Sequence, residues 1–254
     1  MPPPVPIRPE ALSDEGRQRT LLVYALLTGL TPLIPVPFAD DLAKSHLRRR
    51  LIRLLAQAHG RDLSAEIIQA LAREQSRGGC LGGCLAQVLL YPLKKIFRKI
   101  FFFLEWKRAV DLTSYTYHWG YLLDYAFQEG LVEEPSGTST SVDNPSVDDL
   151  RTAIERTCQE APIKPVERAV SATLRQSRAA LLSVVKRLQA NLTKGTTGRA
   201  TEPAAPEQQE EAVSEVSEVS GVATLLQQRI ASAVPEEHFR DLRERFRTHL
   251  QRRT

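Results

Sequence analysis

Thr20-Leu-Leu-Val-Tyr-Ala-Leu-Leu-Thr-Gly-Leu-Thr-Pro-Leu-Ile-Pro-Val-Pro-Phe38 is the first apolar stretch of the chain, and it contains no charged residue. A transmembrane helix needs about 20 apolar residues, so this stretch has almost the length of one. Pro32, Pro35 and Pro37 nevertheless end the helix near Thr31, because proline lacks an amide donor and disfavours helix in the residue before it. Two interpretations follow: a short helix and prolyl turn that dip into a membrane, or a buried helix of a soluble bundle.

The helix before this turn has a clear predicted start. Residues 1–12 are a proline-rich lead that we expect to be extended. Ser13 is predicted to cap the helix that contains the apolar stretch, because a serine oxygen can accept from the first free amides. Asp14 and Glu15 argue against a secretory signal peptide, whose first region is basic.

A basic helix follows the prolyl turn. Asp40 or Asp41 is expected to cap a helix over residues 42–59, and Gly60 is expected to end it. Ser64 is predicted to cap a further short helix. Leucines recur on one face of the longer helix at about 100° per residue. The predicted opposite, membrane-facing side carries Arg48, Arg49, Arg50 and Arg53.

A second uncharged run covers residues 78–93 and begins with glycines. Gly78 and Gly82 are one helical turn apart, as are Gly79 and Gly83. Small residues at this spacing let membrane helices approach closely, so a helix-packing role is predicted. A flexible loop is the alternative.

The segment after Pro92 has a clean amphipathic pattern, with bulky apolar side chains on one helical face and cations on the other. Such a helix is typical of the bilayer interface, where each Lys or Arg near anionic lipid contributes about 1 kcal/mol. A core helix with a solvated basic face is the alternative. The predicted membrane-surface residues here are Lys94, Lys95, Arg98, Lys99, Phe101, Phe102 and Trp106.

An aromatic run from Tyr115 to Phe127 comes next, and it favours a helix that ends at Gly130. Its rings suit either a membrane-interface belt or a packed core. The organisation predicted for the whole chain is the lead, a membrane-associated helical module (13–130), a linker (131–145), a helical hairpin that Ser146 and Asp149 cap (146–192), a disordered acidic linker (193–220) and a C-terminal helix (221–254).

No catalytic residue, metal site or cofactor is predicted. Gly78–Gly83 lacks the Lys-Ser/Thr of a phosphate-binding loop. Cys80 and Cys84 supply only two of the four ligands of a structural zinc site. Three cysteines, an odd number, favour a reducing compartment over a disulfide framework.

Two segments resemble a known family, namely Thr31-Pro-Leu-Ile-Pro-Val-Pro-Phe-Ala-Asp40 and Leu51-Ile-Arg-Leu-Leu-Ala-Gln-Ala-His-Gly-Arg-Asp-Leu-Ser64. The family is a bacterial helical domain of unknown function that occurs beside Era-like GTPase domains and in small inner-membrane proteins. The likeness extends loosely over Leu26–Gly83. It implies a helical, membrane-associated module with no assigned activity.

The expected fold is all-α: a helical bundle with short membrane-dipping or interfacial hairpin helices, plus a separate C-terminal helical hairpin. The predicted function is non-catalytic. The protein is expected to bind anionic lipid on the cytoplasmic face of the bacterial inner membrane and to recruit a protein partner, or a second copy, through its C-terminal helices. No nucleic-acid partner is predicted, because no known motif accompanies the arginines.

The alternative function is a soluble helical enzyme. Its pocket would lie near Asp40, Asp41, His46 and the aromatic cluster Tyr115–Phe127, since an acid, a base and aromatic walls can together bind and convert a small substrate.

Overall fold

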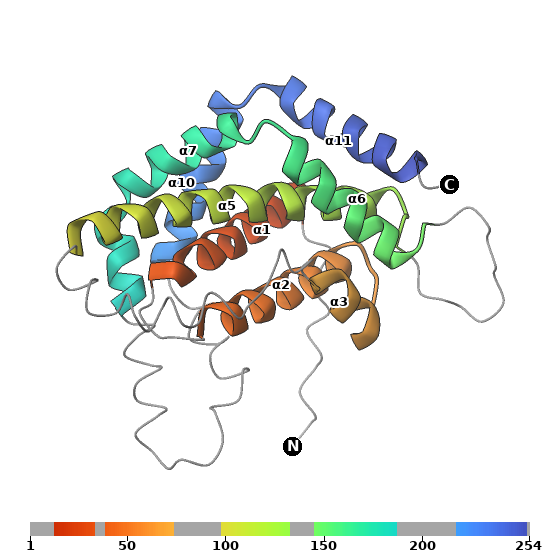
Figure 1. Ribbon diagram of the computed structural model, residues 1–254, viewed down its shortest axis with the longest axis horizontal. Coiled ribbons are helices and arrows are strands. Elements are labelled where there is room, and N and C mark those ends of the chain that lie inside the picture. The colour runs from red at the N-terminus through yellow and green to blue at the C-terminus, as the bar shows by residue number, and fades with distance from the viewer. Residues whose placement is uncertain (1–12, 34–38, 74–97, 133–144, 187–216, 253–254) are drawn as a thin grey trace, which may run out of the picture.

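The computed structural model describes residues 13–33, 39–73, 98–132, 145–186 and 217–252, and every element in these ranges is helical (Figure 1). The prediction of an all-α fold is confirmed. The elements are α1 (Asp14–Leu30), the short 3-10 helix η1 (Thr31–Leu33), α2 (Ala39–Ala58), α3 (Ala65–Ala72), α5 (Arg98–Gln128), α6 (Val147–Glu160), α7 (Lys164–Gln176), α10 (Ser217–Ala233) and α11 (Glu236–Gln251).

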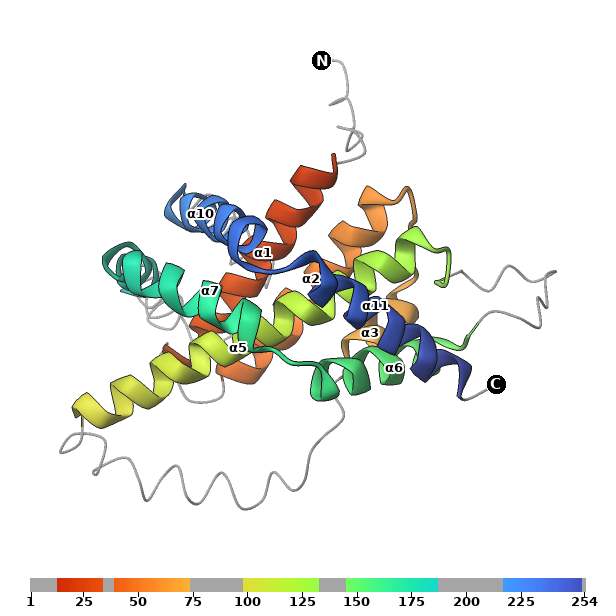
Figure 2. The ribbon, with the colours of Figure 1, turned by 90° about the horizontal axis from the view of Figure 1, so that it is seen from above.

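Helix α5 runs through the middle of the molecule (Figures 1 and 2). Helices α1, α2, α6, α7 and α11 all contact it, and α10 packs between α1 and α7. In Figure 1, α2 and α3 lie below α5, whereas α7 and α11 lie above it. The long central helix therefore serves as the common support on which the shorter helices assemble.

Two glycines let α1 and α5 approach closely. A Cβ added to Gly29 of α1 would lie 2.8 Å from the carbonyl oxygen of Ala109 and closer still to the hydroxyl of Thr113. A Cβ on Gly120 of α5 would likewise collide with the side chain of Leu21. The absence of these two side chains brings the backbones together at the centre of the core.

The apolar stretch of α1 lies inside the protein. Leu22, Leu26 and Leu30 are almost completely buried, and α1 is covered by α5, α10 and α2. For this segment the structure matches the buried-helix interpretation of the sequence. Within the described ranges, no helix is both long and apolar enough to cross a membrane.

The predicted serine caps at Ser13, Ser64 and Ser146 are confirmed. Serine hydroxyl oxygens accept from backbone amides at the starts of α1, α3 and α6, and such a cap is worth about 1 kcal/mol. Gly60 and Gly130 have positive φ angles of 69° and 76°, which end α2 and α5 as the sequence predicts. The three cap bonds are Gly16 to Ser13 (3.2 Å), Ile67 to Ser64 (3.5 Å) and Asp149 to Ser146 (3.1 Å).

The helices after residue 145 differ from the predicted hairpin. Helices α6 and α7 both pack on α5, at different places along it (Figure 1). Pro235 divides the C-terminal segment into α10 and α11, where the sequence suggests one helix from residue 221. Buried residues of all these helices belong to the same apolar core as α1 and α2, so the described helices pack together as one body. The predicted lead, and most of both predicted linkers, lie outside the described residues.

Candidate functional site

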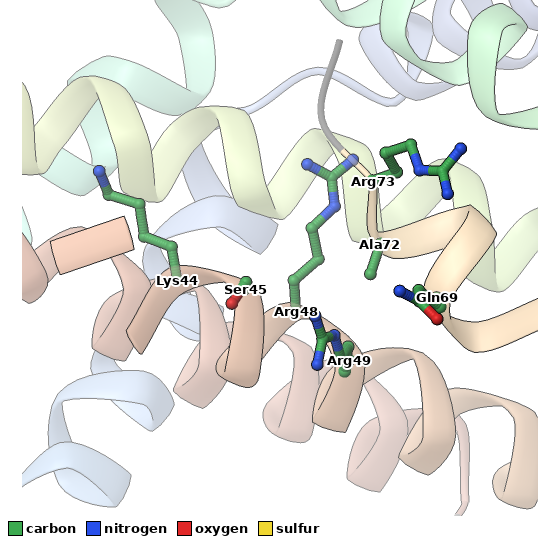
Figure 3. A pocket seen from close by; sticks show the side chains of 7 residues that line it. All are labelled: Lys44, Ser45, Arg48, Arg49, Gln69, Ala72 and Arg73. Atoms are coloured by element: carbon green, nitrogen blue, oxygen red, sulfur yellow. The ribbon is translucent and has the colours of Figure 1, made fainter. Parts of the chain in front are cut away.

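A pocket of ≈ 230 Å³ lies between α2 and the end of α3 (Figure 3). Lys44 and Arg48, one turn apart, extend from the same side of α2, and Arg73 lies across from them at the end of α3. Four of the lining residues are cationic, and the described lining contains no carboxylate. The lining residues are Lys44, Ser45, Arg48, Arg49, Gln69, Ala72 and Arg73.

Helical spacing explains why these residues meet. On α2 they occupy positions i, i+1, i+4 and i+5, and on α3 they occupy i, i+3 and i+4. Residues three and four apart are neighbours on a helix surface. Because α2 and α3 pack against each other, the two rows face one space.

Arg48 is the buried member of this pocket, with only 7% of its surface exposed. Its Nη2 atom lies 3.6 Å from Oε1 of Glu155, which is 3% exposed. Its guanidinium carbon lies 4.1 Å from the centre of the Trp119 ring, a cation–π distance. A buried charge is tolerated only when it is paired in this way.

Glu155 also holds a second arginine. Nη1 of Arg151 lies 3.7 Å from Oε2 of Glu155, and Nη2 of Arg151 lies 3.2 Å from Asp148. Arg151 Nη1 also donates to the backbone carbonyl of Arg73 at 3.3 Å. We call Arg48, Arg151 and Glu155 the buried triad. It connects α2, α6 and the end of α3 directly behind the pocket.

Cys158 is buried near the triad. Burial raises the pKa of its thiol strongly; the Arg48 charge opposes this effect, and the Glu155 charge adds to it. A thiol becomes a nucleophile only as thiolate. Cys158 therefore stays protonated at neutral pH and packs as a small apolar group.

A second polar cluster joins α5 to α11. Nε2 of His118 lies 2.9 Å from Nε2 of His238, and Nδ1 of His118 lies 2.7 Å from the carbonyl oxygen of Ser114. A carbonyl only accepts, so the Nδ1–H of His118 donates to it and Nε2 of His118 accepts from His238. Burial lowers the pKa of His118 to about 4; the bond to Ser114 opposes this shift and the nearby His238 adds to it. Burial also lowers the pKa of His238.

The residues proposed for the alternative enzyme are not gathered in the described pocket. Tyr117 and Tyr121 contact Phe239 of α11, so they line the contact between α5 and α11. The aromatic run is thus part of the packed core. Asp40 and Asp41, one of which the sequence predicts as a cap, lie inside the first turn of α2, which begins at Ala39.

The arginines predicted at a membrane surface separate into two groups. Arg49 and Arg53 are exposed, and Arg50 is half-buried. Arg48 points inward instead, because it lies one turn before the buried Ile52 and finds Glu155 and Trp119 there. Its burial removes it from the outer surface where the sequence analysis placed it.

Other predicted residues are described only in part. Trp106 is half-buried against the core, with the guanidinium carbon of Arg178 6.0 Å from its ring centre. Of Arg98, Lys99, Phe101 and Phe102, the structure describes the helical backbone alone. The residues outside the described ranges are Pro35, Pro37, Gly78, Gly79, Gly82, Gly83, Lys94 and Lys95.

The sequence alone does not indicate the α3 side of the pocket or Glu155 behind it. Arg151 and Glu155 are four residues apart on a predicted helix, which signals a pair. Nothing in the local sequence connects that pair to Arg48. Arg73 stands alone beside an apolar helix and gives no pattern at all.

The comparisons with known proteins add no assignment. No protein-family model, no curated protein and no solved structure matches the chain. Among the described residues, no group of three or more His, Cys, Asp and Glu side chains is placed to hold a metal ion.

Proposed function

We propose that the chain is a non-catalytic helical protein that binds anionic lipid at the surface of a membrane. The observation that carries this proposal is the concentration of cations around the pocket. Arg49, Arg53 and Arg73 are exposed and Lys44 is half-buried; we call these four residues the cationic surface. Arg49 and Arg53 are adjacent on α2, and Arg49 shares the pocket lining with Lys44 and Arg73.

The strength of such binding can be bounded. Each basic residue near an anionic leaflet contributes about 1 kcal/mol. Four of them give about 4 kcal/mol, which corresponds to a dissociation constant near 1 mM. The cationic surface alone thus supports weak, reversible and salt-sensitive attachment. The proposal includes a second contribution to membrane binding, from the basic and aromatic segment that precedes Leu104. Leu104 itself is 53% exposed.

We assign this binding to the cytoplasmic face of the bacterial inner membrane, because residues 31–40 and 51–64 resemble a family that occurs in small inner-membrane proteins. Recruitment of a protein partner or a second copy is assigned to the C-terminal helices. The outer face of α11 carries exposed charges of both signs that suit a polar contact, among them Arg240, Glu244 and Arg247.

Flotation with vesicles tests lipid binding. The full chain should float with phosphatidylcholine vesicles that contain phosphatidylglycerol, and it should stay at the bottom with phosphatidylcholine alone. The double variant R49E/R53E should lose most of the floated fraction, because repulsion replaces attraction. The control R168E/R175E makes the same charge change at exposed positions of α7 and should float almost as well as the wild type.

Salt supplies the second criterion. Exposed charges are screened beyond about 10 Å at 0.1 M salt and beyond about 3 Å at 1 M. The floated fraction should therefore fall steeply with added salt. No flotation with anionic vesicles at low salt would refute the proposal, and so would equal losses in the two double variants.

A further inference from the structure

We propose that the pocket between α2 and α3 binds a phosphate monoester group, with Arg48 as its buried cation. The inference rests on the proposed function where the group belongs to a lipid, and it states which anionic group the cationic surface selects. A soluble phosphate compound presents the same chemistry, so the experiment below separates the two sources.

The size of the pocket favours a single small group. Sites for drug-sized ligands have volumes of about 300–1,000 Å³, whereas this pocket has ≈ 230 Å³. A larger metabolite would have most of its surface outside the pocket. A terminal phosphate, with the remainder of its molecule in solvent or in a bilayer, suits the volume better.

The charge of the lining favours a monoester over a diester. A phosphate monoester carries about −1.5 to −2 charges at pH 7 and three terminal oxygens. A phosphodiester carries one charge and two such oxygens. Arg48, Arg49 and Arg73 line the pocket, and an arginine carries a planar fork of donors that can bind two oxygens of one phosphate. Ser45 and Gln69 add neutral donors to the same lining.

The deepest cation is already fixed in place. Glu155 at 3.6 Å and the Trp119 ring at 4.1 Å hold the Arg48 guanidinium, and Arg151 binds the carbonyl of Arg73 at 3.3 Å. Binding therefore requires little ordering of Arg48, which lowers its entropic cost.

The helix dipole does not favour an anion at this site. The pocket lies at the carboxyl end of α3, whose dipole is negative and repels an anion. The side chains must therefore supply the binding energy, and removal of one of them should have a measurable effect. Arg73 is the best choice because its side chain is exposed and its loss leaves the buried triad intact.

Thermal unfolding in sodium phosphate, compared with sodium chloride of equal ionic strength, tests the pocket itself. We expect the Tm of the wild type to rise by about 3 °C more than that of Arg73→Gln. Phosphate also stabilises proteins by exclusion from their surface, but that effect is common to both chains. Arg168→Gln, an exposed change on α7, should keep the full wild-type rise. Equal rises in the wild type and Arg73→Gln would overturn the inference.

Flotation separates the two sources of phosphate. Vesicles with phosphatidic acid present a monoester, and vesicles with phosphatidylglycerol at matched surface charge present a diester. Preferential flotation on phosphatidic acid, lost in Arg73→Gln, supports a lipid headgroup. A phosphate-dependent rise in Tm without flotation on either vesicle supports a soluble compound and refutes the proposed function. Equal flotation on both vesicles, with no difference in Tm between the wild type and Arg73→Gln, refutes the inference and leaves the proposed function standing.

Discussion

Two buried polar clusters connect the C-terminal helices to α2 and α5. One consists of ion pairs, and the other consists of two neutral imidazole rings. The buried triad joins α6 to α2 through ion pairs between two arginines and one glutamate. The pair of His118 and His238 joins α11 to α5, and burial keeps it neutral. The first cluster therefore depends on an intact partner, whereas the second depends on pH.

The distinction has a structural reason. Arginine cannot lose its proton in a protein, so Arg48 can be buried only beside an acid and an aromatic face. Histidine loses its proton readily, so a buried His118 can avoid charge and satisfy both ring nitrogens with hydrogen bonds. We therefore expect the triad to be destabilised by loss of a charged partner, and the histidine pair to be destabilised by protonation.

The largest expected effect is loss of the shared carboxylate. Glu155→Gln removes the carboxylate that pairs with the buried Arg48, while Arg151 keeps its contact with Asp148 at 3.2 Å. Removing one partner of a buried ion pair typically costs about 3–5 kcal/mol. Urea denaturation at pH 7 should show a loss of this size in the free energy of unfolding.

Glu160→Gln is the matched control on the same helix. Glu160 is exposed and pairs with His249 at 3.1 Å on the surface, where such pairs contribute less than about 1 kcal/mol. Similar losses for the two variants would contradict the burial and charge assigned to the triad.

Acid should weaken the second cluster. The pKa of His118 falls from 6.5 to about 4 on folding, so the unfolded chain binds more protons between these values. The contribution of His118 to the free energy of unfolding is therefore complete above pH 6.5 and decreases as the pH falls through this window. At about 1.4 kcal/mol per pKa unit, His118 contributes about 3 kcal/mol.

Carboxylates also titrate near pH 4, so the measurement must be a difference. The free energy of unfolding of His118→Phe should change less between pH 6.5 and 4 than that of the wild type, although the variant starts lower because His238 loses its acceptor. Parallel pH profiles for the two chains would show that the pair is not the source of the acid sensitivity.

Both clusters also mark the limit of what the sequence predicts. The caps at Ser13, Ser64 and Ser146 were predictable, because a cap involves residues only three positions apart. The His118 bond spans 120 residues, and Arg48 meets an acid on a helix beyond the linker. Such contacts are set by how the helices pack on α5, and helical periodicity in one segment contains no information about them.

The same limit applies to the candidate site. The exposed cations Arg49 and Arg53 were visible as a basic helix face. Helical spacing assigns Arg48 to that face as well, opposite the leucines. Its burial follows only from Glu155 and Trp119, which the sequence places far away.

The smallest expected effect comes from Gly29, an uncharged position. Its pH-independent cost serves as the reference for the two clusters. Gly29→Ala places a methyl group against the carbonyl of Ala109 and the side chain of Thr113, so α1 and α5 must separate. Overpacking of this kind costs about 2 kcal/mol, and the cost should be the same at pH 7 and pH 5. The control Gly221→Ala lies in an exposed part of α10 with no atom within 4 Å, and it should stabilise the chain by about 0.5–1 kcal/mol. If the cost of Gly29→Ala changed with pH as the His118 contribution does, acid would be loosening the whole core, and the contrast between the two clusters would lose its basis.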